Sequence, residues 1–160
     1  MRRYAMAVAV LLIALLVQRG GANGHGREFE AFMTADQEVP PVATEMLGSV
    51  GIRFNDDFTA AKFTLTVKDG VRVTQAHIHC GAQGTNGPIV VFFAGPHAPG
   101  WDVDGKWIDH AQFTDANIVN TACGATLDAL AQSMEAGNTY ANVHTVAHPG
   151  GEIRGQITSK

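Results

Sequence analysis

Basic side chains are scarce in this 160-residue sequence, and three of its arginines lie close to the start. Without Arg2, Arg3 and Arg19, the rest of the chain carries eight basic against 15 acidic side chains, a net charge of about −7 with neutral histidines. Phosphate backbones and anionic lipid surfaces repel an acidic chain. We therefore expect neither a nucleic acid nor an anionic membrane surface as a partner.

The sequence also lacks an apolar run long enough to cross a membrane. Its longest run covers residues 5–17, whereas a spanning helix needs about 20 apolar residues, which disfavours the alternative of a membrane anchor. The run follows two arginines and precedes small residues at 20–22, the order found in cleavable secretory signals. We predict a signal peptide over residues 1–22, a flexible join over 23–28 and one domain over 29–158. The protein is then periplasmic or secreted, with no membrane span after cleavage.

Cysteine occurs only as Cys80 and Cys123. In an oxidising compartment two thiols normally form a disulfide, and the loop closed here would contribute roughly 4 kcal/mol in the chain-entropy model. In the alternative interpretation Cys80, which follows His79, is a metal ligand. We predict the disulfide.

Common hydrolase motifs are missing as well. The sequence contains neither a Gly-x-Ser-x-Gly turn nor a His-Glu-x-x-His helix. No catalytic residue is assigned, and whether the protein catalyses any reaction stays open.

What the sequence does contain is a regular series of short strand patterns. Runs rich in Val, Ile, Phe and Thr alternate with period two between turn residues, which predicts an all-β, antiparallel, Greek-key-like β-sandwich. Residues 126–137 have helical spacing instead, with Thr126 and Gly137 as caps, and predict one short helical crossover. Hairpin turns are expected at 55–57 and 68–70. The predicted strands are 28–34, 47–54, 60–67, 71–79, 88–94, 106–113, 139–145 and 152–158.

Histidine is the informative residue type, since His77 and His79 stand two apart on a predicted strand. Alternate side chains of a strand share a face, so these imidazoles project together while Ile78 points into the core. Neutral imidazole is a favoured ligand of zinc and copper.

Two later strands have the same alternation. Inward Ala141 and Val143 leave Asn142 and His144 on the outer face, and the last strand adds further polar residues there. The resulting exposed polar face comprises Gln75, His77, His79, Asn142, His144, Glu152, Arg154 and Gln156.

We interpret this face as a metal site in which His77, His79 and His144 bind one ion. His148 or Glu152 is the expected additional ligand, and Asn142, Glu152 and Arg154 are expected to orient the ligands. Copper is favoured over zinc on intrinsic affinity, and binding should weaken as the pH falls through about 6.5. In one alternative these polar side chains merely face solvent, and Glu152 and Arg154 form a surface ion pair worth under about 1 kcal/mol. In another, the same face binds an extracellular or periplasmic protein without metal.

Four blocks of the sequence, in order, resemble the chordin-type domain, CHRD. They are Gln37-Glu38-Val39-Pro40-Pro41-Val42; Ala76-His77-Ile78-His79-Cys80-Gly81; Gly84-Thr85-Asn86-Gly87-Pro88-Ile89-Val90; and Tyr140-Ala141-Asn142-Val143-His144-Thr145 with Pro149-Gly150-Gly151-Glu152-Ile153-Arg154-Gly155-Gln156. The resemblance covers about residues 29–157. It implies an extracellular β-sandwich of the kind found in animal chordin and in bacterial exported proteins, and it implies no activity.

A weaker likeness is to copper/zinc superoxide dismutase, in which a His-x-His strand also precedes a disulfide cysteine and a Gly-Pro-His loop. Here those features are His77, His79, Cys80 and residues 95–97. The likeness indicates the metal and not the reaction, because the remaining zinc ligands of that family have no counterpart here. A copper redox enzyme is kept as a third alternative. Neither the oligomeric state nor a partner is indicated.

Overall fold

The computed structural model describes residues 27–160, and the predicted signal peptide lies outside them. Of the predicted join only Arg27 and Glu28 are described, and Glu28 already belongs to the first strand, where it pairs with Arg53. The all-β prediction is confirmed, with a single α-helix among the described residues. The elements are β1 (Glu28–Met33), η1 (Ala35–Gln37), β2 (Leu47–Phe54), β3 (Ala61–Cys80), β4 (Ile89–Ala94), β5 (Trp101–Phe113), η2 (Asp115–Asn117), α1 (Leu127–Glu135), β6 (Thr139–Thr145), β7 (Ile153–Gln156) and β8 (Thr158–Ser159).

The predicted hairpin at 68–70 is wrong, because β3 is one strand of 20 residues that continues through these positions. Asp69 and Arg72 adopt left-handed backbone angles (φ 56° and 52°), and the register with β5 shifts on both sides of Gly70. Such irregularities bend a strand without reversing it. A Lys-Asp-Gly sequence suits a bulge as well as a hairpin, so the two predicted strands are the halves of one bent strand.

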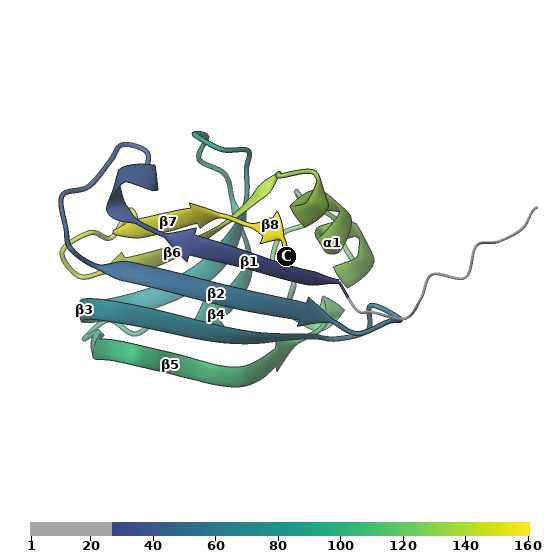
Figure 1. Cartoon of the computed structure of the whole chain (residues 1–160), viewed down its shortest axis with the longest axis horizontal. Coiled ribbons are helices and arrows are strands. Elements are labelled where there is room, and N and C mark those ends of the chain that lie inside the picture. Colours follow the sequence, from purple (N-terminus) through teal and green to yellow (C-terminus); the bar gives the residue numbers. More distant parts are fainter. Residues whose placement is uncertain (1–26) are drawn as a thin grey trace, which may run out of the picture.

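This bend places β3 in both layers of the molecule. Its first half pairs with β2 and β5, and its second half pairs with β6 and β4. The strand order is β7-β6-β3-β2-β1-β8, and backbone hydrogen bonds of 3.0 and 3.1 Å between Thr34 and Arg154 bring β7 beside the end of β1. The sheet is therefore nearly closed around its apolar core (Figure 1).

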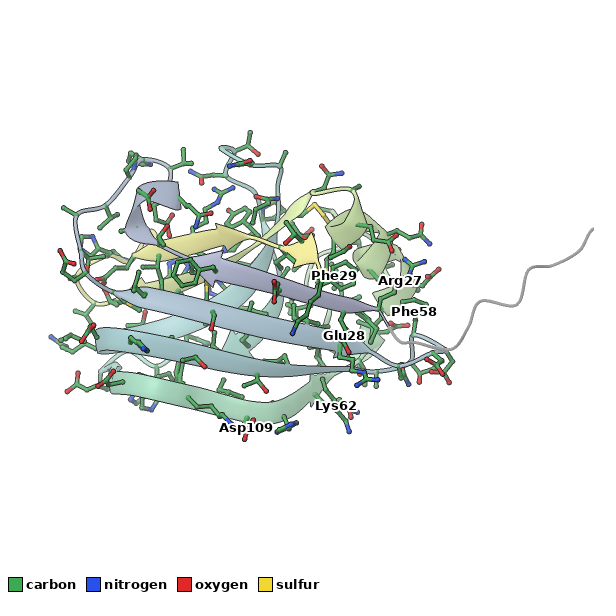
Figure 2. The ribbon with its side chains drawn as sticks, viewed as in Figure 1. Arg27, Glu28, Phe29, Phe58, Lys62 and Asp109 are labelled. Atoms are coloured by element: carbon green, nitrogen blue, oxygen red, sulfur yellow. A yellow bond between two sulfur atoms is a disulfide. The ribbon has the colours of Figure 1, made fainter. Side chains whose placement is uncertain are left out.

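The layer of β1, β2, β5 and the first half of β3 has one buried and one solvated face. Residues of β2 alternate strictly, with inward Val50, Ile52 and Phe54 in the core. Charged side chains such as Glu28 and Lys62 lie on the solvated side (Figure 2). β5 begins at Trp101, earlier than predicted, and the last predicted strand divides into β7 and β8 around the buried Ile157.

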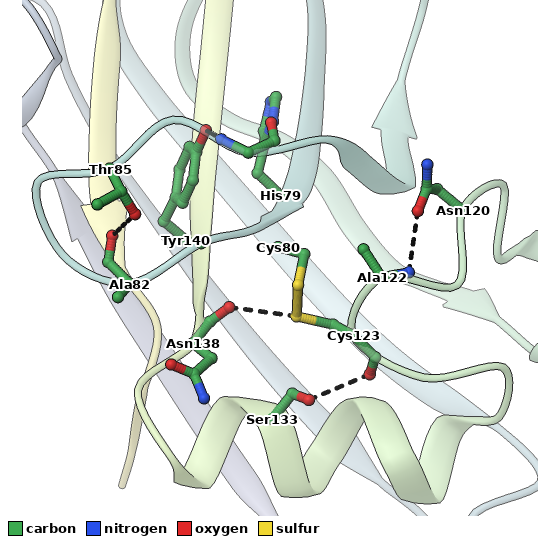
Figure 3. Close-up of a disulfide and its surroundings, with 12 residues drawn as sticks. His79, Cys80, Ala82, Thr85, Asn120, Ala122, Cys123, Ser133, Asn138 and Tyr140 are labelled. Carbon is green, nitrogen blue, oxygen red and sulfur yellow. Dashed lines mark hydrogen bonds between the residues drawn. A yellow bond between two sulfur atoms is a disulfide. The ribbon is translucent and has the colours of Figure 1, made fainter.

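The helix and the disulfide close the other end of the core. Thr126 caps α1 by accepting a hydrogen bond from the Ala129 amide (3.3 Å), as its sequence predicted. Cys80, at the end of β3, is joined to Cys123 by a disulfide (Figure 3), and the Ser133 hydroxyl of α1 donates to the Cys123 carbonyl. No helix within residues 27–160 is long and apolar enough to cross a membrane.

Candidate metal centre

Three of the predicted ligands lie together between β3 and β6. In the register of these strands His77 lies opposite Asn142, His79 opposite Tyr140, and His144 opposite Gln75. Directly opposed residues project on the same side of a sheet, so the three imidazoles converge. Their potential ligand atoms all lie within 4.8 Å of one another.

The polar face that carries them is buried, which corrects the expectation of an exposed face. His77 is fully buried, and His79 and His144 are 8% and 5% exposed. Three connecting segments cover the face: residues 34–46 through the Asn142–Glu38 contact, 81–88 through His79, and 146–152 through His144. Sequence alternation marks only which side chains share a face, so it could not reveal that loops cover these residues.

The hydrogen bonds of two histidines fix which ring nitrogen is available to a metal. His79 Nδ1 lies 2.8 Å from the Gly87 carbonyl oxygen, and His144 Nδ1 lies 3.0 Å from that of Pro149. A carbonyl can only accept, so each Nδ1 carries the proton and each Nε2 presents a lone pair. Metal-bound histidines are commonly oriented by such a bond from the other ring nitrogen. Among the described residues, Nε2 of both His77 and His144 is buried without a hydrogen-bond partner.

The spacing of the rings fits a shared ion. His77 Nδ1 lies 3.1 Å from His79 Nε2 and donates a hydrogen bond to its lone pair in the metal-free protein, so an ion bound by both nitrogens would replace this proton. Two imidazole nitrogens that each lie 2.0–2.1 Å from one ion are about 2.8 to 3.4 Å apart for angles between a right angle and the tetrahedral angle. An all-imidazole set of this kind suits copper or zinc.

Burial also keeps the three imidazoles neutral. Desolvation is the main cause that lowers the pKa of His77 to about 2 and that of His79 to about 4, and it lowers the pKa of His144 as well. The hydrogen bonds to the Gly87 and Pro149 carbonyls act in the opposite direction, but they are weaker than desolvation. Since metals bind only the unprotonated ring, the site is in a binding-competent protonation state at neutral pH.

Two aromatic side chains outside the predicted site pack against the ligands. Tyr140 stacks on His79 with 4.7 Å between ring centroids, and Phe92 meets His77 edge-on at 4.9 Å. Figure 3 shows Tyr140 beside His79. Only the pairing of the strands identifies these two residues, because each lies directly opposite a ligand in the register.

Arg154 contacts the ligand set only indirectly. Its guanidinium lies 3.4 Å from the centre of the Tyr140 ring and donates to Asn86 Oδ1 and to the Ala82 and Thr85 carbonyls. It therefore holds the loop at 81–88, whose Gly87 accepts from His79.

Gly87 links this loop to both stacked rings. Its amide donates to the Tyr140 hydroxyl (3.2 Å), while its carbonyl accepts from His79. A Cβ at this position would lie 1.6 Å from the Cys80 carbonyl oxygen, so only glycine fits.

The structure does not bring the other predicted site residues into the ligand set. The Glu152 carboxylate accepts from the hydroxyls of Thr44 (2.8 Å) and Thr145. His148 is half-buried in the turn after β6, where its backbone bonds to Thr145. Asn142 donates to Glu38 and to the Ile153 carbonyl, so it braces the buried face without contacting a ligand ring through these bonds. Glu38 was not predicted as part of the site, and burial raises its pKa.

Comparison with known proteins gives one match. The family model of the CHRD domain matches residues 29–157. No curated protein and no solved structure matches the chain significantly.

Proposed function

This chain belongs to the CHRD-domain family, and from that premise we propose that it is an exported protein whose domain binds a copper ion through His77, His79 and His144. The observation that carries the proposal is the convergence of three buried imidazoles whose ligand atoms lie within 4.8 Å of one another. Leaving a buried polar nitrogen unpaired costs about 1–3 kcal/mol, and a bound metal would satisfy the buried Nε2 lone pair of His144, which has no hydrogen-bond partner among the described residues.

Copper is favoured over zinc because, among the divalent ions, copper forms the stronger complexes with a given set of nitrogen donors, and because copper also has a monovalent state that zinc lacks. A role in holding or delivering copper needs only these ligands. The alternative of a redox enzyme like superoxide dismutase has less support, since His97, which carried part of that likeness, stacks on Trp101 at 4.1 Å.

Export accords with the disulfide between Cys80 and Cys123, because such bonds persist in oxidising compartments. The predicted signal peptide supports the same compartment. A test is the mass of the protein recovered from outside the cytoplasm, which should begin after residue 22 and contain no free thiol.

Metal binding is tested by titrating chelator-treated protein with copper and with zinc by calorimetry. The wild-type protein should saturate with one copper ion per chain, and His144→Ala should weaken binding at least 100-fold, more than the loss of an orienting partner. The matched control is His110→Ala, which changes the same residue type at an exposed position of β5. No saturable binding by the wild-type protein, or equal affinity in His144→Ala, would contradict the proposal and leave the metal-free interaction module.

A further inference from the structure

We propose that the three-histidine site is selective for monovalent copper, Cu(I), over Cu(II) and Zn(II). This inference rests on the proposed function and specifies the oxidation state that the site takes. Three features of the described residues support it: the number of donors, the depth of burial and the balance of buried charge.

The donor number is the first feature. The cluster offers one nitrogen from each of His77, His79 and His144 and no carboxylate. Cu(II) favours tetragonal sites and Zn(II) tetrahedral ones, so at this buried cluster both would have to take in water as a further donor, whereas closed-shell Cu(I) is stable with three. The two buried carboxylates nearby are engaged elsewhere, Glu38 with Asn142 and Glu152 with two threonines.

Burial is the second feature. The cost of moving an ion from water into a poorly polarisable interior rises with the square of its charge, so a divalent ion costs about four times as much as a monovalent one. The ligands are neutral and buried, and Phe92 and Tyr140 cover two of their rings with apolar surface. Arg154 stacks on Tyr140, so a fixed positive charge already lies near the cluster and repels a divalent ion more strongly than a monovalent one.

Charge balance is the third feature. The buried charged side chains within residues 27–160 are Glu38, Glu152 and Arg154, and all three hydrogen-bond to the segments around the site. When ionised they sum to one negative charge. That charge neutralises a monovalent ion and leaves a divalent ion with an uncompensated positive charge.

The experiment measures three affinities on the intact mature protein. Cu(I) is titrated anaerobically against a chromophoric Cu(I) chelator, and Cu(II) and Zn(II) are titrated separately against chelators of known affinity. We expect Cu(I) to bind at least 100-fold more tightly than either divalent ion. Since each tenfold change in the Cu(I) to Cu(II) affinity ratio shifts a one-electron potential by 59 mV, the bound couple should lie about 120 mV above the free aqueous couple.

The three affinities separate the two proposals. If Cu(II) binds as tightly as Cu(I), copper binding stands and the selectivity is overturned. If no metal saturates the site, the proposed function itself fails.

A variant at Phe92 tests the cause of the selectivity. Phe92 is only half-buried and its ring meets His77, so Phe92→Glu adds a charged oxygen donor beside the cluster without opening the core. We expect the ratio of Cu(I) to Cu(II) affinity to fall at least tenfold in this variant. Phe92→Leu, the matched apolar control, should keep the wild-type ratio. Equal preference in both variants would overturn the charge and donor-number explanation.

Discussion

Strands β2 and β6 both pair antiparallel with β3, yet their burial differs. In β2 every second residue is exposed, whereas all seven residues of β6 are buried. The apolar side of each strand faces the core, but the outer side of β2 faces solvent and that of β6 lies beneath three loops. A polar residue on β2 is solvated, while one on β6 needs a partner inside the protein. The histidines lie in this second, polar interior.

The largest expected effect is the loss of stability on acidification, which should come from the buried polar face and not from the apolar core. Burial lowers the pKa of His77 to about 2 and that of His79 to about 4, against about 6.5 when unfolded. Below pH 6.5 the unfolded chain therefore binds more protons than the folded one, so stability is lost as the pH falls from about 6.5 to about 4 through both residues, and on to about 2 through His77. At pH 5 these two residues lower the free energy of unfolding by about 4 kcal/mol relative to neutral pH, and His144 adds to this loss.

Urea denaturation of metal-free protein at a series of pH values measures this loss. The variant His77→Leu/His79→Leu should show a flatter profile, and an unchanged profile would contradict the assignment. The lowered pKa values also revise the expectation that metal binding weakens below pH 6.5, since the folded site stays unprotonated to a lower pH.

The next prediction compares the two faces of the second half of β3. Ile78→Ala leaves a cavity in the apolar core and should cost about 2–5 kcal/mol. His77→Leu, at the adjacent position on the polar face, should cost less, about 1 kcal/mol in metal-free protein, because it removes the buried Nε2 that lacks a partner while it leaves His79 Nε2 without its hydrogen bond from His77 Nδ1. Chemical denaturation measures both variants. Equal losses would indicate that the histidine serves the fold and not a ligand.

Alanine substitutions at outer positions of β6 and β2 should differ in their stability cost by a smaller amount. Asn142→Ala leaves the buried Glu38 carboxylate without its amide donor and should cost about 1–3 kcal/mol. Arg53→Ala, at an outer position of β2, should change stability by less than about 0.5 kcal/mol, since exposed ion pairs contribute little. Thermal melts measure both variants. Equal shifts in melting temperature would contradict the proposed difference between the two faces.

The alternation of apolar and polar residues predicted the positions of the strands, but it did not predict that the outer side of β6 is buried. Strand β2 has its predicted bounds, because its inward and outward residues differ in polarity. In β6 the outward residues are polar although they are buried, so polarity alone suggested exposure. Two of the three segments that bury them, residues 34–46 and 81–88, are distant from β6 in sequence.

Strand parity predicted that His77, His79 and His144 lie on the polar side of their strands, but their convergence also needs β3 and β6 to be neighbours, which the sequence left as an assumption. The aromatic neighbours Tyr140 and Phe92 were not, since their contacts depend on which residues lie opposite one another across two strand pairs. The bend in β3 was also missed, because left-handed angles at Asp69 and Arg72 produce a bulge where a turn sequence suggests a hairpin.

Glu152→Gln should have the smallest effect, and it concerns a residue that the sequence placed among the ligands or their orienting partners. The carboxylate accepts hydrogen bonds from Thr44 and Thr145, and neither bond involves an imidazole. The ring nitrogens that need orientation already bond to the Gly87 and Pro149 carbonyls. We therefore expect a loss of about 0.5–1.5 kcal/mol from two weakened charge-assisted bonds and a copper affinity within about twofold of wild type. Glu45→Gln, at an exposed position of the same covering segment, is the control and should change neither quantity. A 10- to 100-fold loss of affinity in Glu152→Gln alone would instead show that the carboxylate orients a ligand, because outer partners of metal-bound histidines have effects of that size.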